Sequence, residues 1–192
     1  MKLTSLLTAA QAAKGLADTH NSDREGRAAI AHADISLTQF VKVNGVFKLN
    51  DFNRARFLAW NVRKDEMCEY YIGHNPGKNR SPEEYAYTGQ TEMVDVYSLG
   101  NIFFAILQDE MPFLGVDVKQ VYEKVKNGER ATVYRDLWES TDPIDQVLKQ
   151  VMVNTQSQNY YERWSARKVQ HILETKLKEL DPGWKLTDPF NT

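Results

Sequence analysis

The sequence predicts a mainly α-helical domain that carries one small β-hairpin. Two observations lead to this fold class. Apolar residues recur at three-to-four spacing in several separate segments, and an Asn-Gly dipeptide stands between two short β-prone runs. The chain has 192 residues, of which 42% are hydrophobic, so it is large enough for one globular domain and too apolar for a disordered tail.

Charge and cysteine usage exclude several classes of protein. The chain carries 24 basic and 26 acidic side chains, so its net charge of −2 predicts neither a nucleic acid nor an anionic membrane surface as partner. Cys68 is the single cysteine, which rules out an internal disulfide and favours a cytoplasmic or otherwise intracellular location. The longest apolar run, residues 102–107, is far shorter than the roughly 20 residues of a bilayer span. We therefore expect a soluble chain without a membrane span.

The first expected element is a helix over residues 3–19. Its apolar side chains recur every three or four residues, as on one face of an amphipathic helix. Polar residues such as Thr4, Ser5 and Thr8 interrupt the apolar stretch. We therefore interpret it as a helix and not as a secretion signal.

A β-hairpin is expected next, over residues 40–43 and 46–49. Asn44-Gly45 between the two runs suits a type I′ turn, because both central residues of that turn need positive φ. The chain from 51 to about 83 is polar and contains glycine, proline and asparagine, which discourages any long element. A connection of that length without structure of its own is usually functional or disordered.

A buried central helix is expected over residues 93–107. This segment is apolar on nearly every side, which is typical of a helix surrounded by other elements. Asp95 lies inside it, and a carboxylate in such surroundings needs a hydrogen-bonding partner.

Three shorter helices complete the predicted fold. We expect them over residues 117–126, 143–153 and 166–180. Asp142 and Ser165 stand directly before the last two and have side chains that cap helix N-termini well.

The open end of the hairpin gathers oxygen atoms. Counting outward from the turn places Gln39 opposite Asn50 and Thr38 opposite Asp51. Asp34 lies five residues before Gln39 on the incoming loop. Two carboxylates and an amide oxygen suit Mg²⁺, which completes its octahedron with water and phosphate oxygens, so a site for Mg²⁺ and a triphosphate is one hypothesis. The alternative is a polar hairpin base held by hydrogen bonds alone.

Six short motifs follow one another along the chain. They are His32-Ala33-Asp34, Asp51-Phe52-Asn53, Ser81-Pro82-Glu83, the run from Asp95 to Gly100, Pro112-Phe113, and the run from Glu162 to Ala166. Their order resembles the C-terminal lobe of the eukaryotic protein kinases, with its HRD, DFG and APE motifs and its buried central helix. The resemblance extends from residue 32 to about residue 166.

This resemblance implies a kinase-like C-lobe over residues 1–180, followed by a C-terminal tail over residues 181–192. The catalytic loop would be residues 32–39 and the activation segment residues 51–83. Asp34 would be the catalytic aspartate that accepts or orients the proton of a protein hydroxyl. Asp51 and Gln39 would bind Mg²⁺ against the phosphates of ATP, with glutamine standing where the family has asparagine.

The resemblance also implies a structural framework around these residues. Its members would be His32, Asp95, Glu83 and Arg163. Asp95 would accept hydrogen bonds from backbone N–H groups around His32, and Glu83 would form a buried ion pair with Arg163.

Several residues depart from the family pattern. Ala33 replaces the arginine of HRD, and Ser36 replaces the lysine that usually follows the catalytic aspartate. Thr38 is also neutral, so the catalytic loop supplies no cation for the transferring phosphoryl group. Arg54, Arg56 or a group from elsewhere would have to supply it.

Two functions remain open at this stage. The 31 residues before His32 contain no glycine-rich phosphate loop and no lysine-bearing strand, so we expect the N-terminal lobe to be absent from this chain. The first function is that of a partial protein kinase domain, which transfers a phosphoryl group from ATP to a protein hydroxyl. The alternative is a degenerate pseudokinase lobe that binds a protein partner as a scaffold. Asp34 and Asp51 favour the first function. The absent N-terminal lobe favours the second, as do Ala33, Ser36 and Gln39.

Other conspicuous residues receive no chemical role. Cys68 has no neighbouring cysteine, and His20, His74 and His171 lie far apart without the spacing of metal ligands.

Overall fold

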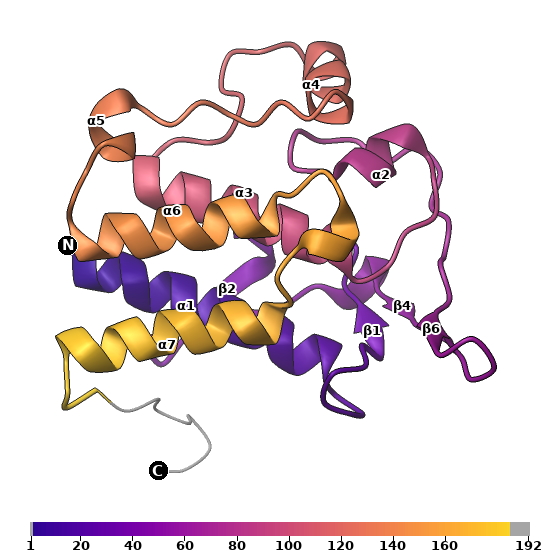
Figure 1. Ribbon diagram of the computed structural model, residues 1–192, viewed down its shortest axis with the longest axis horizontal. Helices are drawn as coiled ribbons and strands as arrows, with labels where there is room; N and C mark the ends of the chain where they lie inside the picture. The colour runs from indigo at the N-terminus through magenta and orange to yellow at the C-terminus, as the bar shows by residue number, and fades with distance from the viewer. Residues whose placement is uncertain (1, 185–192) are drawn as a thin grey trace.

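The computed structural model describes residues 2–184, and most of their regular structure is helical (Figure 1). The α-helices are α1 (Lys2–His20), α2 (Pro82–Ala86), α3 (Met93–Gln108), α4 (Val118–Lys126), α5 (Arg135–Trp138), α6 (Pro143–Thr155) and α7 (Ala166–Leu180). The strands are β1 (Ile30–Ala31), β2 (Phe40–Val43), β3 (Val46–Leu49), β4 (Arg56–Phe57), β5 (Trp60–Asn61) and β6 (Glu66–Met67). Short 3₁₀ helices cover Leu37–Gln39, Phe52–Arg54 and Tyr160–Glu162. Residues 185–192 of the expected tail lie outside the described residues.

The five long helices expected from the sequence are confirmed. Two of them begin at the expected caps. The Asp142 carboxylate accepts hydrogen bonds from backbone N–H groups in the first turn of α6, and the Ser165 hydroxyl accepts one from the N–H of Lys168 in α7. Capping satisfies N–H groups that have no partner within the helix, so these residues fix where each helix begins.

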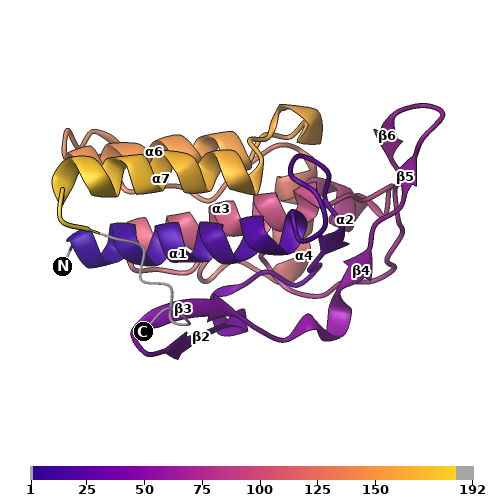
Figure 2. The same cartoon turned by 90° about the horizontal axis from the view of Figure 1, so that it is seen from below.

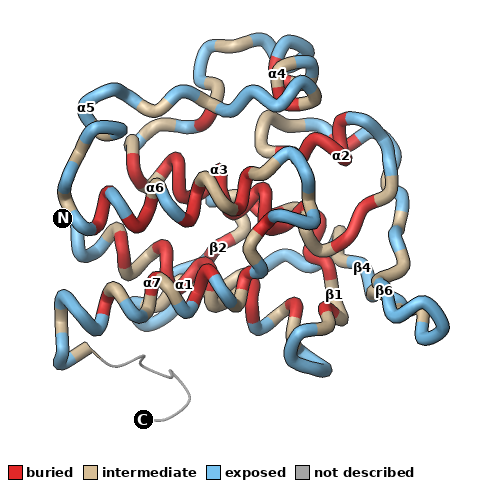
Figure 3. The backbone as a smooth tube through the Cα atoms, in the orientation of Figure 1, coloured by how far each residue is buried: buried red, intermediate tan, exposed pale blue. Residues whose placement is uncertain are grey.

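Helix α3 lies at the centre of the fold. It packs against α6 and α1, and α1 runs beside α7, so that four helices share one core (Figure 2). The buried stretches gather along the inner faces of these helices (Figure 3). Nearly every side chain of α3 is buried, as its apolar sequence predicts.

The contact between α3 and α6 depends on a glycine. A Cβ atom at Gly100 would lie 2.5 Å from Cγ of Gln156 and 2.6 Å from Oγ1 of Thr155. Both distances are shorter than the contacts that a Cβ atom makes in proteins, so glycine at this position lets the end of α6 come close to the central helix.

The hairpin forms with the expected register. Strands β2 and β3 are antiparallel, Val43 pairs with Val46, and Phe40 pairs with Leu49. The Gln11 side chain of α1 accepts a hydrogen bond of 3.0 Å from the N–H of Phe47. The hairpin is therefore fastened beneath α1 (Figure 2). Its open end continues directly from the loop that follows β1.

Residues 51–83 are more ordered than their sequence suggests. β4 pairs with β1, β5 pairs with β6, and α2 covers the end of the segment. Each of these strands has two residues, which is too short for an alternating apolar pattern. The sequence does not predict α5 either, because its four residues are too few to show a helical repeat of apolar positions.

Within residues 2–184, none of the helices combines the length and the apolar character that a bilayer crossing requires.

Candidate active site

The loop that follows β1 is fastened to the central helix by Asp95. Its carboxylate accepts hydrogen bonds of 2.7 Å from the backbone N–H groups of both His32 and Ala33. The side chain of His20, at the end of α1, lies 3.0 Å from the same carboxylate. Asp95 is 1% exposed, and this set of partners explains how a carboxylate is accommodated in the core.

Asp34 follows directly on this anchored backbone, and both of its carboxylate oxygens are held. Nη2 of Arg80 donates to Oδ1 over 2.7 Å, and Nε2 of Gln39 donates to Oδ2 over 2.9 Å. The Asp34 side chain is 18% exposed, so it is largely enclosed and still reachable from solvent. Partners on both oxygens restrict rotation of the carboxylate.

The hairpin brings Asp51 to the same region. The N–H of Asn50 donates to the backbone oxygen of Gln39 over 2.8 Å, which is the pairing that the turn predicts. Asp51 comes next in the chain and adopts the left-handed conformation, with φ of 59° and ψ of 67°. The ring of Phe52 then packs edge-on against His32, with centroids 4.9 Å apart. Residues 34, 39 and 51 therefore lie around the open end of one hairpin.

The donor set at this end of the hairpin suits a hard cation. A carboxylate can only accept hydrogen bonds, so the amide nitrogen of Gln39 must face Asp34, and its amide oxygen is left as a possible ligand. Asp51 is exposed, and among the described residues its carboxylate makes no hydrogen bond or ion pair. One carboxylate and one amide oxygen match the few protein ligands that Mg²⁺ takes when phosphate oxygens and water complete its shell. In residues 2–184, this region included, no group of three or more His, Cys, Asp or Glu side chains gathers to hold a metal ion, so a cation here would depend on the amide oxygen and on ligands from outside the chain.

The far end of the 51–83 segment is held by a buried ion pair. Arg163 binds Glu83 with two parallel hydrogen bonds, of 2.5 and 2.8 Å. The guanidinium also donates to the backbone oxygens of Ser157 and Met93 and lies 5.0 Å from the ring centre of Tyr97. Glu83 and Arg163, which the sequence places 80 positions apart, therefore meet as a bidentate pair in the core.

A second buried carboxylate, Glu84, lies beside this pair. It accepts hydrogen bonds from the backbone N–H and hydroxyl of Ser81 and from the side chain of Asn75. Burial raises the pKa of Glu84 to about 7, although the nearby Arg80 guanidinium acts in the opposite direction. Ser81 and Glu84 form a capping box at the start of α2, a role that the Ser-Pro-Glu-Glu sequence signals locally.

Sequence reasoning missed two partners of these residues. His20 receives no chemical role from the sequence, and the structure gives it a structural one, as a buried partner of Asp95. Arg80 contacts Asp34, whereas Arg56 donates to backbone oxygens of its own segment. The signal that could have found Arg80 is the lack of any lysine or arginine in residues 32–39, which requires a cation from elsewhere.

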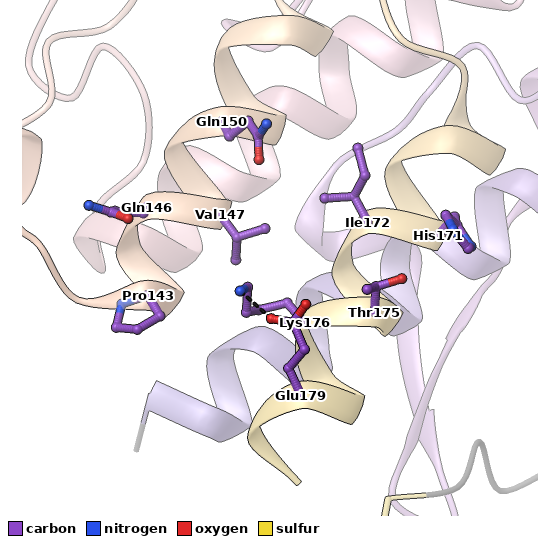
Figure 4. A pocket seen from close by; sticks show the side chains of 9 residues that line it. All are labelled: Pro143, Gln146, Val147, Gln150, His171, Ile172, Thr175, Lys176 and Glu179. Atoms are coloured by element: carbon purple, nitrogen blue, oxygen red, sulfur yellow. Dashed lines mark hydrogen bonds and ion pairs between the residues drawn. The ribbon is translucent and has the colours of Figure 1, made fainter. Parts of the chain in front are cut away.

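A cavity of about 510 Å³ lies between α6 and α7, away from the loop and the hairpin (Figure 4). Val147 and Ile172 form part of its wall, and Lys176 and Glu179 form an ion pair at its edge. His171 also lines it, but no predicted site residue does.

Comparison with known families identifies the fold. Residues 6–174 match the model of the protein kinase domain. The chain belongs to the protein kinase domain family. The matched range includes the loop at Asp34, the hairpin, the buried helix α3 and both residues of the Glu83–Arg163 pair.

Two curated relatives give a measure of the similarity. The chain is 28% identical over 151 residues to serine/threonine-protein kinase 33 of Mus musculus, an alignment that covers 73% of this chain and 29% of the relative. It is 29% identical over 102 residues to a probable serine/threonine-protein kinase PLK of Dictyostelium discoideum, which covers 52% of this chain and 10% of the relative. The chain spans less than a third of the length of either relative.

Proposed function

We propose that residues 1–180 act as the C-terminal lobe of a protein kinase and that residues 32–51 take part in phosphoryl transfer from ATP to a hydroxyl group of a protein. The observation that carries this proposal is the arrangement of Asp34. The backbone that precedes it is anchored by Asp95, its carboxylate is held on both oxygens, and it lies at the hairpin end that also presents Asp51. Positioning of this kind is most of what a protein contributes to phosphoryl transfer.

Asp34 is the proposed acceptor of the hydroxyl proton. Because Arg80 and Gln39 each occupy one oxygen, the remaining lone pairs of the carboxylate are free to face a substrate hydroxyl. A carboxylate in this position orients the hydroxyl and takes its proton as the new bond to phosphorus forms.

Asp51 and Gln39 are the proposed ligands of Mg²⁺. A bound Mg²⁺ ion would neutralise charge on the phosphates of ATP. The exposed Asp51 carboxylate and the free amide oxygen of Gln39 support this assignment. Both offer oxygen atoms that can bind a metal ion and that have no other partner among the described residues.

A serine or threonine hydroxyl is the proposed acceptor. The curated relatives of the chain are named as serine/threonine kinases, which favours this class of substrate.

A second candidate function is that of a protein-binding scaffold. The loop at residues 32–39 contains no cation, and Gln39 uses its amide group to bind Asp34. Both features are compatible with a lobe that retains the family framework without phosphoryl transfer.

Thermal unfolding of the chain with Mg²⁺ and ATP separates these two functions. If Mg²⁺ and ATP bind, a concentration about ten times the Kd raises the Tm by roughly 3–6 °C. The Asp51→Asn variant removes the charge and tolerates the left-handed backbone at this position, so we expect it to lose most of the shift. Asp23→Asn, at an exposed carboxylate of the α1–β1 loop, is the matched control and should keep the shift. An unchanged Tm in the wild-type chain would favour the scaffold.

A further inference from the structure

Arg80 is a buried cation that contacts the loop carrying Asp34, and its Nη1 also lies 4.0 Å from the Glu84 carboxylate. Its side chain is 6% exposed. Nη2 donates to Oδ1 of Asp34 over 2.7 Å, and Nη1 donates to the backbone oxygen of Ala33 over 3.3 Å. Nε donates to the backbone oxygen of Pro76 over 3.1 Å, and this hydrogen bond ties the guanidinium to its own segment. The guanidinium thus bridges residues 76–80 and residues 33–34.

The loop itself provides no positive charge. Residues 32–39 contain neither lysine nor arginine. Arg80, which lies 46 positions later in the chain, is the cation that contacts Asp34 among the described residues. Burying a guanidinium is costly unless it is paired and hydrogen-bonded, so a contact with the one acidic side chain of this loop is not an incidental surface ion pair.

The residue before Arg80 holds the same loop from another side. Nδ2 of Asn79 donates to the backbone oxygen of Ile35 over 2.7 Å. The backbone oxygen of Asn79 accepts hydrogen bonds from the side chains of Ser98 and Asn101 in α3, at 2.7 and 3.1 Å. The dipeptide 79–80 is therefore fixed on the central helix and contacts three successive residues of the loop.

We infer that Arg80 is a positioning residue for Asp34, and that the 51–83 segment supplies through it the positive charge that the loop at residues 32–39 lacks. This inference rests on the proposed function and extends it to regulation. Because Arg80 belongs to the segment and not to the loop, Oδ1 of Asp34 is held only while residues 76–80 are docked, whereas Gln39 holds Oδ2 from within the loop. Displacement of the segment would remove the charged partner of Asp34, leave its carboxylate held on one oxygen, and so reduce transfer.

The contact is tested first by a double-mutant cycle on unfolding, without nucleotide. The variants are Arg80→Met, Asp34→Asn and their combination, with Arg63→Met as a control at an exposed arginine. Arg80→Met should lower the folded-to-unfolded ratio at least tenfold, and this loss should be at least fivefold smaller when Asp34 is already asparagine. Additive effects of the two changes would overturn the inference, whether or not the chain transfers phosphate.

The catalytic consequence is tested by phosphoryl transfer from ATP to a generic serine-containing protein such as casein. Arg80→Met should reduce kcat at least tenfold with the KM for ATP changed less than threefold, and Arg80→Lys should restore part of kcat. An unchanged kcat in Arg80→Met, with an active wild type, would refute the positioning role. An inactive wild type would instead count against the proposed function, and the unfolding cycle would still decide whether Arg80 holds Asp34.

Discussion

Replacing Arg163 by methionine should strongly destabilise the chain. The side chain of Arg163 is fully buried, and its two hydrogen bonds to Glu83 measure 2.5 and 2.8 Å. Methionine leaves Glu83 as an uncompensated buried charge, which costs about 3–5 kcal/mol. It also leaves the backbone oxygens of Ser157 and Met93 without this donor. The free energy of unfolding of a typical domain is about 5–15 kcal/mol, so losing the Arg163 interactions would remove a large part of it.

Urea unfolding followed by circular dichroism measures this effect. Glu83→Gln should cost less than Arg163→Met, because the amide oxygen can still accept one of the two hydrogen bonds. The double variant should be more stable than the sum of the two losses predicts, because the buried charge that each single change leaves behind is then absent. A loss below about 1 kcal/mol for Arg163→Met, or strict additivity in the double variant, would show that the pair contributes little.

Three further predictions concern packing, capping and pH. Gly100→Ala should cost about 1–3 kcal/mol in urea unfolding, because its Cβ would overlap with Gln156 and Thr155; an unchanged midpoint would mean that α6 moves aside freely. Ser165→Ala should cost about 1 kcal/mol by the same assay, because the first turn of α7 loses its cap, and Ser165→Asp should recover most of that loss. Burial raises the pKa of Glu84 from its ordinary 4.5 to about 7, so the folded state binds this proton more tightly than the unfolded state does. The contribution of Glu84 to the free energy of unfolding is therefore fully present below pH 4.5 and is lost as the pH rises through 7. The total loss is about 3 kcal/mol. Glu84→Gln should therefore gain stability relative to the wild type between pH 5 and pH 8, and parallel pH profiles of the two proteins would contradict the shift.

Local signals in the sequence predicted most of the fold. The long helices have clear three-to-four periodicity, and Asp142 and Ser165 mark where two of them begin. Asn44-Gly45 determines the register of the hairpin and therefore the pairing at Gln39. These features depend on residues close together in the chain, which is why the sequence alone reveals them.

The remaining features depend on contacts between distant segments. β1 pairs with β4 across a separation that no local pattern encodes. Arg80 reaches Asp34 over 46 positions, and His20 reaches Asp95 over 75. His20 ends an amphipathic helix and looks like an ordinary surface residue in the sequence. Only the packed arrangement shows that it faces the core, so part of the site framework could not be predicted.

The transfer of radiolabelled phosphate from ATP to a serine- or threonine-containing protein tests the central claim most directly. The wild-type chain and the Asp34→Asn variant should be compared at equal concentration, with Asp23→Asn as the control. We expect Mg²⁺-dependent transfer by the wild type and the control, and a loss of about 10²–10⁴-fold in Asp34→Asn, the range that a positioned base contributes. Equal transfer by Asp34→Asn and the wild type, or no transfer by any of the three proteins, would contradict the proposed role of this site.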